Sequence, residues 1–241
     1  MPARRPSPSP DPAGERHAVP LGPGQSTTAT VYRAASPSGR LLVLAHGAGA
    51  GQHHPFMTAI ASRLAARGIA VVTFDFGYIH AGRKVPDRAP VLEACFGGVI
   101  DWAAGRDEFA SHRLLIGGKS MGGRMATHLA AAGFVARSGA GPALSGVVAL
   151  GYPLHPPGKP QQLRAAHLDA IRAPWLIVQG SRDTFGTPDE LRLAVAGMTA
   201  AVTLHVVEGG DHSFAVARTP RDAVLAAVAD VVVRWADSSN L

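Results

Sequence analysis

The stretch LLIGGKSMGG at residues 114–123 decides the fold. Its apolar start predicts a buried strand, and the residues after Ser120 predict a helix. Between the two lies the pattern G-x-S-x-G, formed by Gly118, Ser120 and Gly122. A serine on so sharp a turn needs a strained backbone, and side chains two residues away on either side would collide. The pattern therefore predicts that Ser120 is a nucleophile whose hydroxyl stands clear of the sheet.

Short apolar runs alternate with segments of helical period on both sides of this turn. Expected strands cover residues 41–45, 69–74, 113–117, 145–150, 175–179 and 202–207, and expected helices cover 55–67, 91–104, 121–132, 188–198 and 214–235. This alternation predicts an α/β fold with a mostly parallel central sheet and helices on both faces. Residues 27–33 are expected to add an antiparallel edge strand. The connection between residues 150 and 175 leaves room for one helical turn around 162–170, so we expect an open cleft with little or no cap.

Composition indicates one folded domain behind a disordered tail. Residues 1–22 are rich in Pro, Ser and charge, and such a segment buries too little apolar surface to fold. Residues 23–241 then form a single domain, since the chain's length and its 46% hydrophobic residues suffice for a sizeable core.

Charge and cysteine content exclude several classes of function. The formal charge of +6 comes from 23 Lys and Arg against 17 Asp and Glu, and these cations are scattered, so we expect no nucleic-acid partner. No run reaches the roughly 18 apolar residues that span a bilayer, and the N-terminus lacks the apolar segment of a signal peptide. Cys95 is the single cysteine, which excludes an internal disulfide. We expect a cytoplasmic monomer or homodimer that acts on a small-molecule substrate without a cofactor or a membrane.

A serine hydroxyl needs a base, and the base needs an orienting carboxylate. Asp183 follows the expected strand 175–179 and is our candidate acid. Asp189 is the competing candidate, although it lies at an expected helix start, where acidic residues are common. His212 lies in a glycine-rich loop after the last expected strand and is the candidate base. Asp211 beside it is expected to face solvent or to cap the last helix.

An oxyanion hole needs two backbone donors. The N–H of Met121, at the start of the helix after the nucleophile, is the first expected donor. The second should come from the loop HGAGAG at residues 46–51, with Ala48 as the first choice and Gly49 as the alternative. His46 is expected to stabilise this loop and not to act as a second base.

Two nucleotide-binding patterns are incomplete. Residues 118–120 read GKS, like the end of a P-loop, but Arg113 stands where that motif needs its first glycine. Residues 47–51 read GAGAG, like a dinucleotide turn, but Gln52 or His54 replaces the third glycine, depending on where counting starts.

Other polar residues are weaker candidates. His53 and His54 are adjacent and lack the spacing of a metal-binding pair, so no metal is expected, and one of them is a candidate for the pocket mouth. The densest basic group is Arg83, Lys84 and Arg88. A solvated surface is the simpler interpretation of this group, and the alternative is that Arg83, Lys84 and Arg88 favour an anionic substrate.

Six motifs together resemble a known family. They are HGAGAG (46–51), GRKVPDRAP (82–90), GGKSMGGRMA (117–126), GYPLHPPGKP (151–160), GSRD (180–183) and GGDHSF (209–214). The set is similar to bacterial dienelactone-hydrolase-like proteins of the α/β-hydrolase family, which also includes animal testis-expressed and chromatin-complex relatives.

The resemblance runs from residue 41 to residue 235. It implies a three-layer α/β-hydrolase fold and a triad of Ser120, Asp183 and His212. It also implies a site framed by residues 82–84 and 151–154, which makes Tyr152 a candidate for substrate binding. Dienelactone hydrolases proper use a cysteine nucleophile, whereas this chain carries serine at that position.

The expected reaction is acyl transfer to water through an acyl-enzyme, as in a carboxylesterase or a dienelactone-hydrolase-like enzyme. A scaffold that binds a partner without turnover is the main alternative, because one fold can serve many functions. Hydrolysis of thioesters or of carbon–carbon bonds would use the same residues.

Overall fold

A computed structural model describes residues 14–134 and 144–238. Within these residues one eight-stranded sheet has the order β1-β2-β4-β3-β5-β6-β7-β8. The strands are β1 (Glu15–Gly22), β2 (Gln25–Tyr32), β3 (Arg40–Ala45), β4 (Ile69–Phe74), β5 (Arg113–Lys119), β6 (Leu144–Leu150), β7 (Trp175–Gly180) and β8 (Val202–Val207). Strands β3 to β8 are parallel to one another, and β2 runs antiparallel to both β1 and β4.

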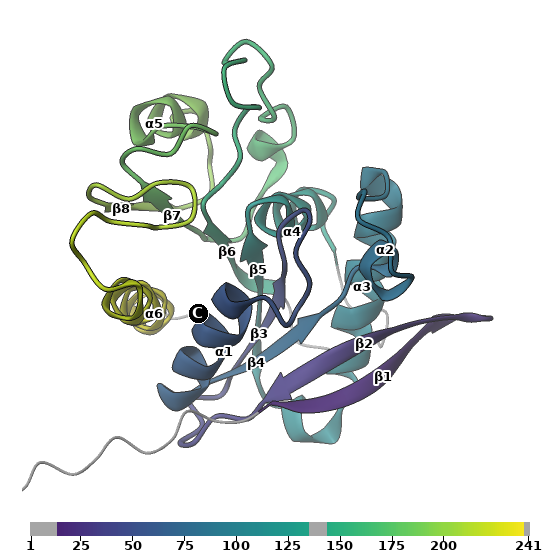
Figure 1. Cartoon of the computed structure of the whole chain (residues 1–241). Helices are drawn as coiled ribbons and strands as arrows, with labels where there is room; N and C mark the ends of the chain where they lie inside the picture. Colours follow the sequence, from purple (N-terminus) through teal and green to yellow (C-terminus); the bar gives the residue numbers. More distant parts are fainter. Residues whose placement is uncertain (1–13, 135–143, 239–241) are drawn as a thin grey trace, which may run out of the picture.

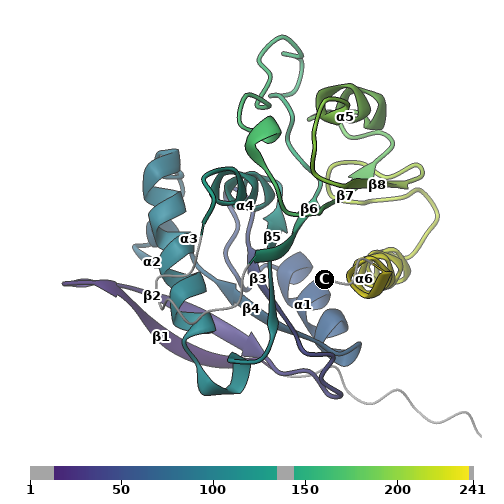
Figure 2. The same ribbon diagram turned by 180° about the vertical axis from the view of Figure 1, so that it is seen from behind.

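Helices cover both faces of the sheet, which gives three layers (Figures 1 and 2). They are α1 (Pro55–Ala66), α2 (Gly77–His80), α3 (Ala89–Ala104), α4 (Met121–Ala131), α5 (Pro188–Val195) and α6 (Arg221–Ser238), with 3-10 turns at Asp107–Phe109 and Leu168–Ala170. Helices α1 and α6 pack side by side on one face, and α3 and α4 pack on the other.

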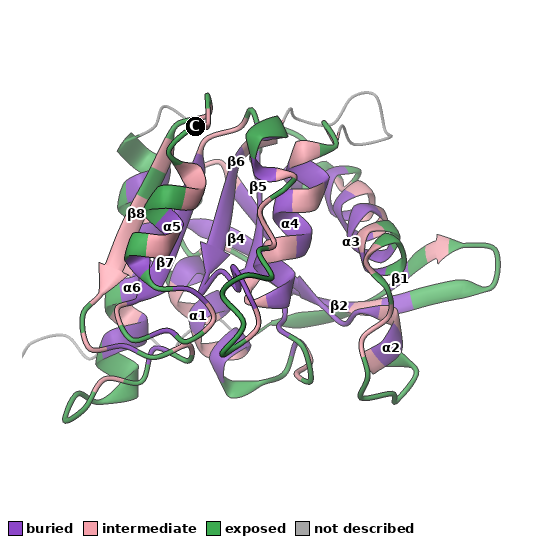
Figure 3. Cartoon of the chain, turned by 90° about the horizontal axis from the view of Figure 1, so that it is seen from above, coloured by how far each residue is buried: buried purple, intermediate pink, exposed green. Residues whose placement is uncertain are grey.

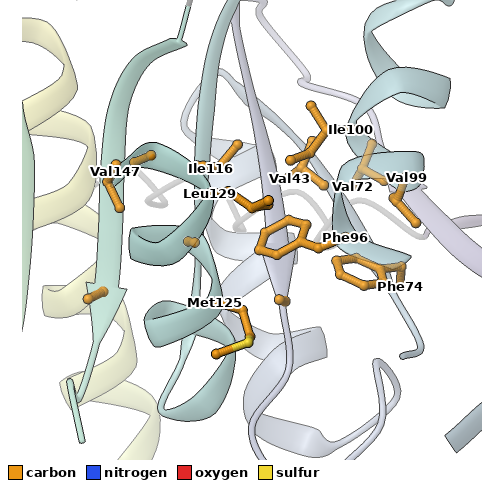
Figure 4. Packing of buried hydrophobic residues seen from close by; sticks show 14 of the residues in the cluster. Val43, Val72, Phe74, Phe96, Val99, Ile100, Ile116, Met125, Leu129 and Val147 are labelled. Atoms are coloured by element: carbon orange, nitrogen blue, oxygen red, sulfur yellow. The ribbon is translucent and has the colours of Figure 1, made fainter. Parts of the chain in front are cut away.

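The alternating side chains of each strand build two separate cores. In β3, Leu42 and Leu44 face the α1 and α6 layer, whereas Val43 faces the opposite layer. Figure 4 shows the second core, where Val43 and Ile116 of the sheet lie among side chains of α3 and α4. Because both faces are covered, the central strands are buried along their length, and exposed residues concentrate on the outer helix faces and the β1–β2 hairpin (Figure 3).

Every strand and helix expected from the sequence has a counterpart in the structure. The strands at 69–74 and 202–207 have the expected bounds, and most other ends differ by one or two residues. The expected antiparallel strand at 27–33 is β2, but it is not an edge strand, because β1 lies outside it.

The prediction of a disordered segment through residue 22 is wrong for its last part. Residues 15–22 form β1, which pairs with β2 across a tight turn at Gly24. Val19 is fully buried, and Leu21 packs against α3 near Gly98. The sequence prediction failed here because the segment is mostly polar, whereas Val19 and Leu21 lie on the same face of the strand and point toward the core. Residues 1–13 lie outside the described part of the chain.

The final helix begins later than expected, at Arg221 instead of residue 214. Phe214 and Arg218 have φ angles of 59° and 60°, which are incompatible with a continuous helix. The Asp211 carboxylate accepts hydrogen bonds from the backbone N–H groups of Ser213 and Ala215, at 2.8 and 2.9 Å. It therefore shapes the loop that carries His212 and does not cap the helix.

The connection from β6 to β7, residues 151–174, holds only one 3-10 turn, and the expectation of little or no cap is confirmed. In the described ranges, no helix combines the length and the apolar character needed to cross a membrane.

Val19→Ala should lower the free energy of unfolding by about 2 kcal/mol, because it removes two buried methyl groups. Val85→Ala is the matched control, since Val85 is 75% exposed and its truncation should change little. Urea unfolding of both variants measures the difference. Equal stabilities would mean that residues 15–22 contribute nothing to the fold in solution.

Candidate active site

Ser120 sits on the turn between β5 and α4 with φ 51° and ψ −116°, a conformation that L-residues rarely adopt. The glycines on both sides make this turn sterically feasible. A Cβ on Gly118 would lie 2.4 Å from the carbonyl carbon of Gly122, and a Cβ on Gly122 would lie 2.4 Å from the Ala45 oxygen. The backbones of β5, α4 and the end of β3 therefore meet without room for a methyl group.

The structure brings Ser120, Asp183 and His212 together in a hydrogen-bonded chain. His212 Nδ1 lies 2.8 Å from Asp183 Oδ2, and His212 Nε2 lies 2.8 Å from Ser120 Oγ. The carboxylate only accepts, so the proton of a neutral imidazole resides on Nδ1, and Nε2 is free to accept the serine proton. The Phe185 ring stacks on the imidazole at a centroid distance of 4.1 Å.

Asp183 is fully buried, and its carboxylate has several donors. Gln179, near the end of β7, donates its amide N–H to Asp183 Oδ2 at 2.9 Å, and the Phe185 N–H donates to Oδ1 at 2.8 Å. Sequence reasoning missed Gln179, although a polar residue at the end of an otherwise apolar strand was the available signal. The competing candidate Asp189 lies in the first turn of α5, where it pairs with Arg192 on the surface.

The loop after β3 lies directly against the nucleophile. A Cβ on Gly47 would be 3.5 Å from Ser120 Cβ, and Ala48 lines the same cavity as Ser120. His46 is buried below this loop, where its Nδ1–H donates to Gly47 O at 2.8 Å and its Nε2 accepts from the Phe76 N–H at 3.0 Å. Burial lowers the pKa of His46, which keeps the ring neutral in this structural role.

A buried polar network fixes the far end of the same loop. The Gln52 N–H donates to Asp75 Oδ1 at 2.8 Å, and its side-chain amide donates to Asp75 Oδ2 at 3.0 Å. Thr30 donates to Gln52 Oε1 at 2.8 Å, which connects the network to β2. The loop is therefore held by strands β2 and β4 as well as by β3.

A cavity of 270 Å³ opens at Ser120. Its walls are Gly47, Ala48, Ala50, His54, Phe56, Met57, Lys119, Ser120, Phe185, His212, Ser213 and Arg221. His54 is the member of the histidine pair that reaches the cavity, and its Nδ1 also accepts from the Phe56 N–H at the start of α1.

Three candidate substrate-binding residues lie elsewhere. Tyr152 is fully buried and donates its hydroxyl to Arg164 O at 2.8 Å, which corrects the expectation that it faces substrate. Arg83 forms an exposed bidentate pair with Asp87 and lines a separate hollow between the β1–β2 hairpin and α3. His53 is exposed and does not line the cavity.

Lys119 occupies the variable position before the nucleophile, and sequence reasoning did not single it out. Its Nζ is buried and has no hydrogen-bond partner among the described residues. The ammonium lies 5.9 Å from the centre of the Phe56 ring and 5.7 Å from that of Phe214. A Cβ on Gly151 would lie only 2.9 Å from Nζ, so a side chain there would clash with the ammonium. Burial lowers the pKa of Lys119 to about 8, against the opposing attraction of Asp183 and Asp211.

In the described ranges of the chain, no group of three or more His, Cys, Asp or Glu side chains is arranged to hold a metal ion. The single cysteine, Cys95, lies in α3 with its side chain in the hydrophobic core, and burial raises the pKa of its thiol to about 11. It is therefore a packing residue and not a nucleophile at neutral pH.

The sheet order and the turn at Ser120 define an α/β-hydrolase fold. Residues 38–237 match the family model described as "Alpha/beta hydrolase domain", and the chain belongs to that family.

Solved structures with the same fold include three relatives of low sequence identity. Dienelactone hydrolase from Anabaena variabilis is 20% identical with a TM-score of 0.71, over 93% of this chain and 97% of that one. Est1E from Butyrivibrio proteoclasticus is 16% identical with a TM-score of 0.69, and the match covers 94% of this chain and 99% of that one. A serine hydrolase without a lid from Xanthomonas campestris is 18% identical with a TM-score of 0.65, and the match covers 92% of this chain and 94% of that one. The similarity to dienelactone-hydrolase-like proteins is thus confirmed, while the link to animal relatives stays a prediction.

Lys119→Met should raise the free energy of unfolding at pH 7 by about 3 kcal/mol, because it removes a buried, unpaired ammonium. The unfolded chain binds the proton up to pH 10.5 and the folded chain only up to about pH 8. The loss of folding stability caused by the buried ammonium is therefore complete below pH 8, and it decreases as the pH rises toward 10.5. Urea unfolding at pH 7 and 9.5 measures this change.

Lys159→Met is the control for that measurement, because Lys159 lies on an exposed loop. A Lys119→Met variant that is less stable than the native chain at pH 7, or whose gain is equal at both pH values, would contradict the interpretation.

Proposed function

We propose that the protein is a serine hydrolase that cleaves an ester bond of a small substrate. The observation that carries this proposal is the pair of 2.8 Å contacts that join Ser120 to His212 and His212 to Asp183 at the floor of a cavity. A hydroxyl in such a chain is activated as a nucleophile.

In the first step Ser120 Oγ attacks the ester carbonyl, and His212 Nε2 takes the hydroxyl proton. The buried Asp183 carboxylate stabilises the imidazolium that forms and keeps the ring oriented. His212 then returns the proton to the alcohol oxygen, which leaves as the ester bond breaks.

The negative charge that develops on the carbonyl oxygen needs fixed donors. We assign them to the backbone N–H groups of Met121, at the N-terminus of α4, and of Ala48 in the loop beside Ser120. Loss of one such donor typically raises the barrier by about 3 kcal/mol. The Gln52–Asp75 network supports this step because it restrains the loop that presents Ala48.

Water completes the cycle. The water oxygen attacks the acyl carbon while His212 accepts a proton from the water. His212 then returns that proton to Ser120 Oγ as the acid leaves. Two structural relatives, the dienelactone hydrolase from Anabaena variabilis and the esterase domain of a Rhodothermus marinus protein, support ester chemistry over thioester or carbon–carbon hydrolysis. The size of the cavity, 270 Å³, favours short acyl groups.

Ser120→Ala should lower the turnover of p-nitrophenyl acetate and butyrate by about 10⁶-fold, to the background rate, because the nucleophile is absent. Covalent labelling by a fluorophosphonate should disappear in the same variant. Release of nitrophenol and intact-mass spectrometry measure the two effects.

Ser26→Ala is the control, because Ser26 is exposed on β2 away from the cavity. Absence of both turnover and labelling in the native protein would reject the hydrolase and favour a scaffold that binds without turnover.

Asp183→Asn should lower kcat by about 10⁴-fold, since the neutral amide no longer stabilises the imidazolium or fixes its tautomer. Asp189→Asn should retain full activity, because Asp189 lies on the surface at the start of α5. Steady-state kinetics with p-nitrophenyl butyrate separates the two carboxylates. A larger loss in Asp189→Asn than in Asp183→Asn would reverse the assignment.

A further inference from the structure

We propose that the cavity selects esters that carry a second, negatively charged group, and that Lys119 binds this group as a carboxylate. This inference rests on the proposed hydrolase function and names a substrate class for it. Lys119 would be a specificity-determining residue next to the nucleophile.

The walls of the cavity carry cationic or neutral groups and no acidic side chain. Its ionisable lining residues in the described part of the chain are Lys119, Arg221, His54 and His212. Asp183 and Asp211 attract the Lys119 ammonium, but neither carboxylate lines the cavity or accepts a hydrogen bond from it. Asp183 is buried and accepts from three other donors. A recess lined in this way attracts anions, since low-dielectric walls focus the field of the cations.

The Lys119 ammonium lacks an acceptor. The described residues provide it with no hydrogen bond, and the faces of Phe56 and Phe214 supply only a weaker attraction at nearly 6 Å. A buried cation without a partner is unfavourable for folding, so its place beside a nucleophile indicates a functional role. A carboxylate in the cavity would supply the missing acceptor and convert an unpaired charge into a charge-assisted hydrogen bond.

The structure makes room for this lysine. Gly151 has a φ of 70°, and a Cβ there would lie 2.9 Å from Lys119 Nζ. Glycine at this position thus provides both the left-handed backbone and the space for the ammonium. Lys119 lines the cavity while its Nζ is buried, and rotation about the flexible bonds of its side chain presents Nζ to an occupant.

The remaining walls fit the chain that would join ester and carboxylate. Phe56 and Met57 of α1 and Phe185 offer apolar contacts suited to methylene groups. Arg221 is exposed at the first turn of α6, which lies beside α1 (Figure 1), and adds a second cation at the rim. The arrangement fits a half-ester of a short dicarboxylic acid, or an ester whose alcohol part carries the carboxylate.

The test compares substrates that differ by one charged group. Mono-p-nitrophenyl adipate and p-nitrophenyl hexanoate have equal chain lengths, with a carboxylate replacing the terminal methyl group. 4-Acetoxybenzoate and phenyl acetate form the corresponding pair for the alcohol side. The rate measured with Ser120→Ala is subtracted as background for each ester.

In the native protein, kcat/KM should favour the charged member of at least one pair by about tenfold, the effect expected of one charge-assisted hydrogen bond. Lys119→Met should abolish that preference by reducing the ratio of the two kcat/KM values about tenfold. Lys159→Met, on an exposed loop, should leave the ratio at its native value. The pair that shows the preference identifies the side of the ester that reaches Lys119.

A binding measurement keeps this inference separate from the hydrolase assignment. Calorimetric titration of Ser120→Ala with monomethyl adipate and with 4-acetoxybenzoate should give a Kd that rises about tenfold when Lys119→Met is added. Turnover of neutral esters with no preference for charge in either pair, and with equal Kd values, would overturn the role of Lys119 and leave the hydrolase intact. Absence of all turnover and labelling would reject the hydrolase, while the titration would still report on Lys119.

Discussion

The site depends on a steric constraint, the close approach of three backbone segments below Ser120. Gly118, Gly122 and the end of β3 at Ala45 lie so near one another that no Cβ fits at either glycine. This approach forces the positive φ of Ser120, aims its hydroxyl away from the sheet and places the start of α4 beside it. It also brings the loop after β3 against the nucleophile, because that loop begins at Ala45.

Parallel strand order supplies the partners of the serine. Strands β5, β6, β7 and β8 are neighbours in that order, so the loops at their carboxyl ends meet at one edge of the sheet. His212 therefore lies 2.8 Å from Asp183 Oδ2 and 2.8 Å from Ser120 Oγ, although Asp183 is 29 positions and Ser120 is 92 positions away in the chain. Gln179 extends the chain of hydrogen bonds into the body of the sheet, because it binds Asp183 and also the backbone at Tyr152 and Gly186. Orientation of the imidazole is thus anchored in buried structure and not only in a surface loop.

Lys119 shows how such a site can retain an unfavourable group. Its neighbours in the chain are fixed by the turn, and its ammonium lies near Phe56, Phe214 and Gly151 from three other segments of the chain. Proteins commonly sacrifice stability at functional sites, where a strained backbone or an unpaired charge serves binding or reaction. The positive φ of Ser120 and the unpaired Lys119 are adjacent examples.

The sequence by itself determined what local pattern controls. Apolar runs, helical periods and glycine positions predicted the order of the central elements, the turn at Ser120 and the loops that carry Asp183 and His212, because each depends on residues within one segment. Only the tertiary structure decided that residues 15–22 form a strand, that Tyr152 turns away from the cavity, and that Arg83 lies elsewhere. It also revealed Gln179 and Lys119, whose surroundings come from segments far apart in the chain. Burial, pairing and missing partners are properties of such long-range contacts, and no periodicity within a single segment encodes them.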